Sequence, residues 1–286
     1  MPPGIVSVDF IKIAGIIEVE GITLRYPRLL AFCLFVVFTI IVIAVLPLRA
    51  EIDPQYTPQL EQLTLKLKVR GFTDDELGKI FTDSRVVLYP PVVEKSGKGL
   101  DYFHRKFGLL TKKSIQRGQL VLRENKEIFN KIEETFGVEK EIILGILRVE
   151  TNFGSHTGNY AIFNSLLSMT LIENRRSSWA ETELIEFLSI CKEQNRDPLS
   201  IKGSWAGAFG ICQFVPTSYA KFAVDGNSDG AVDLFNFQDA IASIASYLKY
   251  HGYEKNKPVN NREAVYAYNH CDNYVKAIFA YAKALK

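Results

Sequence analysis

Glu150 is the residue whose type and position best suit acid–base chemistry. It ends a run, 142–149, in which apolar residues recur at helical spacing, and it lies four positions after Ile146 and three after Leu147. Its side chain should therefore point to the same side as the apolar stripe, and Gly154 predicts a helix end close behind it. Desolvation and the negative end of the helix dipole would both raise the pKa of this carboxyl, as a general acid requires. The alternative is a surface glutamate at a frayed helix end.

A second stretch lacks side-chain bulk. Three glycines and two alanines are among the eight residues 203–210. Such small residues allow a ligand or another backbone segment to approach closely. Ser204 and Gln213 can offer hydrogen bonds there, and Trp205 and Phe209 offer apolar faces. Tight helix packing or a plain turn would explain the same composition.

Residues 225–239 have the pattern of a calcium loop. Oxygen-bearing side chains at positions 1, 3 and 5 are followed by glycine at position 6, namely Asp225, Asn227, Asp229 and Gly230. Position 7 would offer the Ala231 carbonyl, and Asp233 stands at position 9. Position 12 is Asn236 instead of the usual glutamate, and Asp239, three residues later, could replace it in a longer loop. A solvated turn without metal is the alternative.

Composition narrows the class of protein. The 286 residues have a formal net charge of +2, so nothing argues for nucleic acid as a partner. The length suffices for one large or two smaller domains. Four cysteines form no CxxC or Cys/His pattern, which argues against zinc and redox sites. Cys191, Cys212 and Cys271 lie beyond the N-terminal apolar segment, and they allow at most one disulfide without indicating which.

Residues 29–48 predict a transmembrane helix. These 20 residues carry no charge, and at helical rise they extend roughly 30 Å, the hydrocarbon thickness of a bilayer. Arg25 and Arg28 before the segment favour a cytoplasmic N-terminus, although Arg49 behind it weakens the asymmetry. Cleavage after Ala50 is the alternative, but the preceding charged region is long and the segment exceeds a usual signal peptide. We therefore predict a retained anchor, and residues 1–28 have no functional interpretation.

From Gln55 onward the apolar period is helical and strands are scarce. One stripe comprises Leu60, Leu63, Leu67 and Val69, and the run 72–77 is typical of a capped helix start. Helical patterns follow over about 113–136 and 179–193, whereas 155–165 are predicted to be irregular and suited to line a cleft. In the amphipathic C-terminal segment, Tyr268 and Asn269 alone would be ordinary core and capping residues.

Together, the runs 146–154 and 203–219 and the 225–239 loop resemble the lytic murein transglycosylase B family in content, order and separation. The resemblance covers roughly residues 55–286 and leaves 1–50 uncovered. It implies a mainly α, lysozyme-like helical domain with an EF-hand-like calcium loop, preceded here by one N-terminal transmembrane helix. The predicted organisation is an unassigned segment 1–28, an anchor 29–48 and a catalytic region 55–286.

The resemblance also implies roles for individual residues. The catalytic acid/base of the family corresponds to Glu150. The residues lining its saccharide cleft correspond to Ser204, Gln213, Tyr268 and Asn269. This chain departs from the family at Cys212 and at His270-Cys271, next to these positions, and a Cys212–Cys271 disulfide is one pairing that the departures allow.

The calcium loop of the family is an EF-hand variant longer than usual, which accounts for Asn236. By that resemblance the ligands are Asp225, Asn227, Asp229, the Ala231 carbonyl and Asp239. We expect the Ca²⁺ to be structural, because its loop lies well after Glu150 in the sequence, and we expect no organic cofactor.

The implied reaction is non-hydrolytic cleavage of the MurNAc–GlcNAc bond of peptidoglycan, which leaves 1,6-anhydroMurNAc ends. A single carboxyl suffices for it, whereas hydrolysis by either two-carboxylate route needs a second acid, for which the sequence offers no strong candidate. The alternatives are a hydrolytic muramidase acting on the same bond and a non-catalytic peptidoglycan-binding scaffold. The expected partners are glycan strands and the membrane, and the expected location is the bacterial inner membrane, single-pass, with the catalytic region in the periplasm.

Overall fold

The computed structural model describes residues 17–19, 22–24, 52–94, 100–255 and 257–286. The chain divides into two units, Met1–Arg49 and Ala50–Lys286. In the first unit, β1 (Ile17–Val19) pairs antiparallel with β2 (Ile22–Leu24).

The predicted membrane segment, 29–48, lies outside the described residues. None of the helices among the described residues combines the length and the apolar character that crossing a membrane requires.

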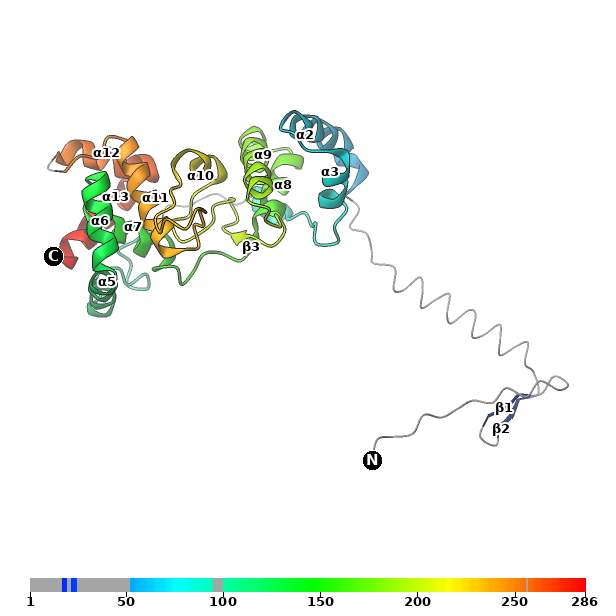
Figure 1. Ribbon diagram of the computed structural model, residues 1–286, viewed down its shortest axis with the longest axis horizontal. Helices are drawn as coiled ribbons and strands as arrows, with labels where there is room; N and C mark the ends of the chain where they lie inside the picture. Colours follow the sequence, from blue (N-terminus) through cyan, green and yellow to red (C-terminus); the bar gives the residue numbers. More distant parts are fainter. Residues whose placement is uncertain (1–16, 20–21, 25–51, 95–99, 256) are drawn as a thin grey trace. The chain divides into compact units, whose positions relative to one another are not determined.

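The second unit is mainly helical, as predicted, and its helices form two groups (Figure 1). The first group contains η1 (Pro54–Tyr56), α2 (Thr57–Val69), α3 (Asp74–Phe81), α4 (Pro90–Glu94), α8 (Ile162–Leu171) and α9 (Ser177–Glu193). The second contains α5 (Lys112–Glu124), α6 (Lys126–Phe136), α7 (Lys140–Thr151), α11 (Phe237–Tyr250), α12 (Pro258–Tyr268) and α13 (Asp272–Leu285). The short helix α10 (Pro216–Phe222) packs on both α9 and α11 and so joins the two groups.

The helix start predicted at 72–77 is the N-terminus of α3. The Thr73 side chain accepts a hydrogen bond from the Glu76 amide, and the Glu76 carboxylate accepts one from the Thr73 amide at 2.7 Å. This capping box satisfies two amides that would otherwise lack partners.

Two helical patterns differ from their prediction. On α2, Leu63 and Leu67 are buried, but Val69 is 88% exposed because the helix ends there and the chain turns at Gly71. The pattern over 113–136 is two helices, α5 and α6, which are separated at Asn125.

The stretch 155–165 is only partly irregular. It contains β3 (Tyr160–Ala161), which pairs antiparallel with β4 (Lys202–Gly203), and the start of α8. All residues of α8 are buried. A helix that is buried on every side has no polar face, so it lacks the periodic pattern from which helices are recognised.

Helix α7, which carries Glu150, lies in the core of the second group. Residues 142–148 are buried, and α7 packs closely on α13. Gly145 permits this contact, because a Cβ there would lie 3.2 Å from the Ile278 carbonyl oxygen. Each buried Leu or Ile side chain contributes roughly 1.5–3 kcal/mol to folding, so α7 is a rigid support for the residue in its last turn.

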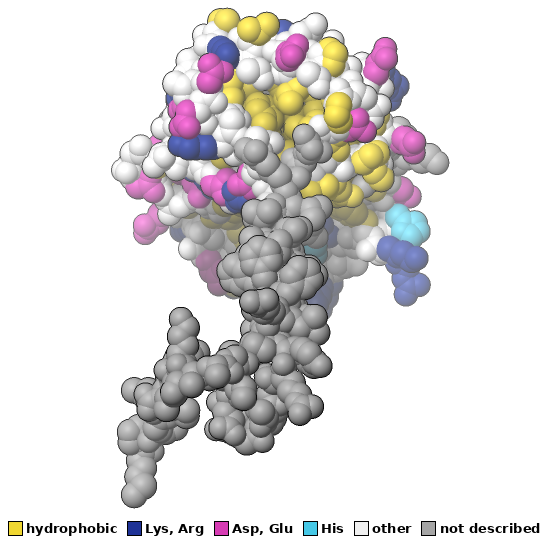
Figure 2. Space-filling model, turned by 90° about the vertical axis from the view of Figure 1, so that its right-hand side faces the viewer, with side chains coloured by type: hydrophobic (Ala, Val, Ile, Leu, Met, Phe, Trp, Pro, Cys, Tyr) yellow, Lys and Arg dark blue, Asp and Glu magenta, His cyan; other side chains and the backbone are white. Residues whose placement is uncertain are grey.

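The end of the second unit that carries α2 and α3 exposes apolar side chains. Figure 2 shows hydrophobic side chains gathered on this face, with acidic and basic side chains interspersed around them. On α2, Leu65 and Val69 are exposed apolar side chains.

Candidate active site around Glu150

Glu150 lies in the last turn of α7, as the sequence predicts. The helix ends because Asn152 adopts a left-handed conformation with φ 51°, followed by Phe153 and Gly154 with φ 60° and 80°. The Thr151 hydroxyl then donates to the Ile211 carbonyl at 2.8 Å and accepts from the Gly154 amide at 2.9 Å. The end of the helix is thereby tied to residue 211, which directly follows the glycine-rich stretch 203–210, here called the glycine-rich loop.

The Glu150 carboxyl has one direct hydrogen-bond partner from a distant part of the chain. The Tyr274 hydroxyl, on α13, donates to Glu150 Oε1 at 2.7 Å. Tyr274 is fully buried, so its ring and hydroxyl are held in place by packing.

Aromatic rings surround this pair. The rings of Tyr268 and Tyr274 are stacked, with centroids 6.4 Å apart, and the ring of Tyr102 meets Tyr274 edge-on at 5.7 Å. The Tyr268 hydroxyl donates to the Cys212 carbonyl at 2.6 Å. Tyr274 and the two rings packed on it thus place aromatic surface beside the Glu150 carboxyl.

This environment favours the neutral acid. Burial raises the pKa of Glu150 from 4.5 to about 7, and the hydrogen bond from Tyr274 opposes the shift. Burial, with the Glu150 charge as a lesser cause, raises the pKa values of Tyr268 and Tyr274. The two tyrosines therefore keep their protons at neutral pH, whereas Glu150 is poised to release or accept one near pH 7.

The predicted pair Tyr268 and Asn269 meets this site. Asn269 ends α12, and its side chain forms a hydrogen bond with Tyr102. The pair, although distant in sequence, therefore belongs to the surroundings of Glu150.

Ser204 and Gln213 are held by hydrogen bonds to the backbone. Ser204 Oγ accepts from the Ala206 and Ala208 amides at 3.3 and 3.0 Å. Gln213, with φ 53°, donates through Nε2 to the Thr157 carbonyl at 3.0 Å and to the Gly210 carbonyl at 2.9 Å. Gln213 thus joins the 155–165 stretch to the glycine-rich loop.

The glycines of this loop are sites of close approach within the protein. A Cβ at Gly203 would lie 2.2 Å from the Ala208 carbonyl oxygen, one at Gly207 2.6 Å from Leu166, and one at Gly210 2.4 Å from Leu234. The glycine pattern could indicate the approach of a ligand or of another part of the protein. The structure shows that other parts of the protein approach these glycines.

Sequence reasoning did not identify Tyr274 or Tyr102 as site residues. Tyr274 has the spacing of an ordinary core residue in an amphipathic helix, and Tyr102 belongs to a loop without a periodic pattern. The only signal in the sequence was the number of tyrosines in the C-terminal segment.

The three cysteines in the described part of the chain are free thiols. A Cys212–Cys271 disulfide is therefore not formed in this structure. Burial raises the pKa of the Cys212 thiol, which keeps that group neutral and unreactive.

The 225–239 loop is closed by Asp239, as its predicted length requires. Asp239 is 1% exposed, and its carboxylate accepts from the Gly226 amide at 2.9 Å and from the Asp233 amide at 2.7 Å. The Asp225 carboxylate accepts from the Ser228 and Gly230 amides. Across the described ranges, no three acidic, histidine or cysteine side chains converge closely enough to hold a metal ion. The donor set, all oxygen, is nevertheless of the kind that Ca²⁺ prefers.

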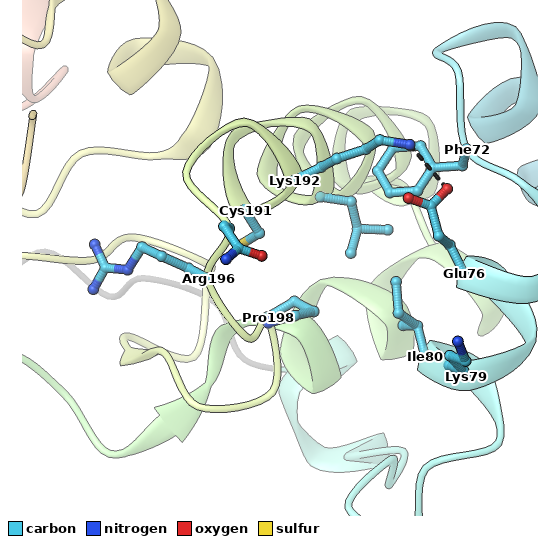
Figure 3. Close-up of a pocket in the computed structure, with 10 residues that line it drawn as sticks. Phe72, Glu76, Lys79, Ile80, Cys191, Lys192, Arg196 and Pro198 are labelled. Atoms are coloured by element: carbon cyan, nitrogen blue, oxygen red, sulfur yellow. Dashed lines mark hydrogen bonds and ion pairs between the residues drawn. The ribbon is translucent and has the colours of Figure 1, made fainter.

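A cavity of about 300 Å³ lies between α3 and α9, apart from Glu150. Figure 3 shows Lys192 reaching across it to Glu76, at 2.9 Å, over the ring of Phe72. Arg196, at its edge, pairs with Asp233 at 3.2 Å. Because these charges are satisfied by other protein groups, the cavity is a weaker candidate for chemistry than the surroundings of Glu150.

Comparison with known proteins relates this chain to transglycosylases. Residues 56–263 match the family described as the transglycosylase SLT domain. Over 157 residues, or 55% of the chain, the sequence is 37% identical to the membrane-bound lytic murein transglycosylase B of Escherichia coli strain K12. That alignment spans 43% of the relative, so the chain matches less than half of its length.

Solved structures share the fold. The Escherichia coli lytic transglycosylase SLT35 in complex with bulgecin A superposes with a TM-score of 0.72 at 24% identity, covering 81% of this chain and 92% of that one. SLT35 has also been solved in complex with calcium, with the same score and coverage. SltB3 from Pseudomonas aeruginosa, in complex with NAG-anhNAM-pentapeptide, gives a TM-score of 0.72 at 22% identity, covering 80% of this chain and 79% of that one.

Proposed function

We propose that this chain, which belongs to the transglycosylase SLT domain family as its resemblance to lytic murein transglycosylase B predicted, cleaves peptidoglycan with Glu150 as its single acid/base group. The observation that carries the proposal is the partly buried carboxyl of Glu150, hydrogen-bonded to Tyr274, with a pKa raised to about 7. A group with that pKa can donate a proton and accept one within a single turnover at neutral pH.

The mechanism needs only this carboxyl. Neutral Glu150 protonates the oxygen of the MurNAc–GlcNAc bond as that bond breaks, and the acetamido group of the sugar stabilises the positive charge at C1. The Glu150 carboxylate then accepts the proton of the 6-hydroxyl, whose oxygen attacks C1 and closes the 1,6-anhydro ring. The proton returned to Glu150 restores the starting state.

Hydrolysis by a two-carboxylate route fits the site less well. A second carboxylate a few ångströms away would raise the pKa of Glu150 through its charge, but burial is the only cause of the increase that the described residues supply. We therefore propose the anhydro product, for which one carboxyl suffices, and product analysis distinguishes it from hydrolysis.

Product analysis tests the reaction. Mass spectrometry of muropeptides released from purified peptidoglycan should show ends that are one water lighter than hydrolytic products. Reducing MurNAc ends would establish a muramidase instead. Binding without any release of muropeptides would identify a non-catalytic scaffold.

Tyr274 is proposed as a positioning residue for the carboxyl. Its hydrogen bond lowers the pKa of Glu150, so Tyr274→Phe should raise that pKa further. Because the protonated form is the general acid, kcat/KM should fall above pH 7 in the wild type and at higher pH in the variant. Tyr281→Phe is the matched control, since Tyr281 is a buried tyrosine of the same helix that donates to Ser114 at 2.7 Å. An unshifted alkaline limb in Tyr274→Phe would exclude the proposed role.

The loop 225–239 is proposed to bind a structural Ca²⁺ through Asp225, Asn227, Asp229, the Ala231 carbonyl and Asp239. The all-oxygen donor set and the closure of the loop by Asp239 support this assignment. When bound, the ion would neutralise the gathered carboxylates and hold the loop against the start of α11.

Calcium should therefore raise the thermal stability of the protein and should not take part directly in peptidoglycan cleavage. Saturating Ca²⁺ should raise the Tm of the wild type by roughly 5–10 °C over the chelated protein, and it should not raise that of Asp239→Asn. Asp272→Asn, an exposed aspartate outside the loop, serves as the control. Loss of turnover on chelation at an unchanged Tm would contradict a structural role.

Ser204, Gln213, Tyr268 and Asn269 are proposed to line the glycan-binding surface, and residues 29–48 to anchor the chain in the inner membrane with 55–286 in the periplasm. The Escherichia coli relative is named membrane-bound, which supports the anchor. Recovery of the full chain in the soluble fraction after cell lysis would argue against it.

A further inference from the structure

The segment 100–117 carries a concentrated positive charge next to the candidate active site. It contains one acid, Asp101, and a histidine. Its fully charged cations are Arg105, Lys106, Lys112, Lys113 and Arg117. We call these five side chains the basic cluster.

The basic cluster is exposed and has no acidic partner among the residues that the structure describes. Arg117 donates to Ser155 Oγ at 2.9 Å, a neutral group. Elsewhere in the second unit, cations such as Lys66 and Lys140 form ion pairs. Because no carboxylate in the described part of the chain pairs with these cations, the segment favours an anion supplied from outside the chain.

The segment is fixed against the helix that carries Glu150. Arg148, which is 8% exposed, donates to the Phe107 carbonyl at 2.9 Å and to Ser114 Oγ at 2.8 Å. At the other end, Tyr102 packs on Tyr274, the partner of Glu150. An anion bound by the basic cluster would therefore be held in a defined relation to the scissile bond.

We propose that the basic cluster binds the carboxylates of the peptides attached to the glycan strand, an inference that rests on the proposed function. Peptide stems carry free carboxylates at intervals along the strand, and Lys and Arg side chains recognise such groups. The same segment encloses a cavity of about 180 Å³, lined by Phe103, His104, Arg105, Gly108, Leu109, Leu110 and Thr111. That volume suits one amino-acid side chain and is too small for a disaccharide.

An anionic lipid surface would also attract these cations, but the apolar side chains of the segment argue against it. Insertion into a membrane interface needs apolar side chains that protrude. Leu100, Phe103 and Leu110 are 61%, 48% and 43% exposed, and the most prominent apolar side chains, Val69 at 88% and Tyr250 at 74%, lie elsewhere.

Binding to sacculi tests the inference apart from turnover. The full chain with Glu150→Gln is compared with the same chain carrying Arg105→Gln, Lys106→Gln, Lys112→Gln and Lys113→Gln. The matched control changes four other exposed lysines by the same charge: Lys126→Gln, Lys131→Gln, Lys249→Gln and Lys276→Gln. Each protein is offered native sacculi, sacculi whose carboxylates have been converted to amides, and phosphatidylglycerol vesicles.

Neutralising the four cluster residues should weaken binding to native sacculi about tenfold, which corresponds to about 1.4 kcal/mol shared among four exposed charge contacts. Amidation of the sacculi should weaken binding of the protein with an intact cluster to the same extent. The cluster variant should bind amidated sacculi no more weakly than it binds native sacculi. The control should bind like the protein with an intact cluster. Equal binding by the cluster variant and the control would overturn the inference. So would a loss confined to phosphatidylglycerol vesicles, which would identify lipid as the ligand.

The proposed function can fail separately. Wild-type protein that releases no anhydro-muropeptides, yet shows the carboxylate-dependent binding, would refute the reaction and leave the peptide-binding site in place.

Discussion

Glu150→Gln is expected to lower kcat for peptidoglycan cleavage by about 10²–10⁴-fold, the contribution typical of a positioned general acid–base group. The amide keeps the shape of the side chain and can still accept the hydrogen bond from Tyr274, but it cannot deliver a proton. The measurement is the rate of release of soluble muropeptides from purified sacculi. Glu134→Gln makes the same chemical change at an exposed site on α6 and should leave the rate unchanged.

Glu150→Gln should also be more stable than the wild type at pH 8. The carboxyl has a pKa of 4.5 when exposed and about 7 in the folded protein, so the folded state binds the proton more tightly. Its stabilising effect is complete below pH 4.5 and is lost as the pH rises through 7, by up to about 3 kcal/mol. Glutamine has no charge to desolvate and avoids this loss. A variant that is inactive because it is unfolded would show the opposite change in Tm.

Gly158→Ala is expected to destabilise the fold by more than about 4 kcal/mol, in the range where single substitutions cease to be tolerated. Gly158 has φ 102°, and a Cβ there would lie 2.0 Å from the Gly203 carbonyl oxygen and 2.7 Å from the Ser204 amide nitrogen. Both are backbone atoms, so no side chain can rotate out of the way. The contact joins the 155–165 stretch to the glycine-rich loop, and urea unfolding of the purified variant measures its cost.

Gly252→Ala separates steric overlap from backbone strain. Gly252 also has a positive φ, 85°, but nothing lies within 4 Å of the position a Cβ would take. Its substitution by alanine should lower the free energy of unfolding by only about 1–2 kcal/mol, the cost of a left-handed conformation for a residue with a Cβ. Equal losses in the two variants would show that the close approach at Gly158 does not constrain the structure.

Features encoded by neighbouring residues could be predicted from the sequence. The capping box at Thr73 and Glu76 is complete within four residues, and the end of α7 follows from Asn152 to Gly154. The raised pKa of Glu150 could also be predicted, because the apolar residues one turn earlier already place its side chain toward the core.

Features that depend on residues far apart in the chain could not be predicted from the sequence. Tyr274 reaches Glu150 across 124 positions, and nothing in its own helix distinguishes it from a core tyrosine. The buried helix α8 shows no polar face, so 155–165 were expected to be more irregular than they are. The glycine pattern at 203–210 indicated a close approach but could not identify Ala208, Leu166 and Leu234 as the groups that approach.

The charge pattern of 100–117 illustrates the same limit. Its cations are evident in the sequence, but their relation to Glu150 depends on Arg148 and Tyr102, whose contacts only the folded chain defines. A basic stretch therefore acquires a candidate ligand only when its position beside the candidate active site is known.

Titration of the Glu150 carboxyl by ¹³C NMR, assigned by comparison with Glu150→Gln, tests the central claim most directly. The proposed mechanism predicts a midpoint near pH 7, in agreement with a pKa raised by burial to about 7. A midpoint near the ordinary value of 4.5 would show that the carboxyl is ionised when the glycan binds, and Glu150 could not then be the general acid.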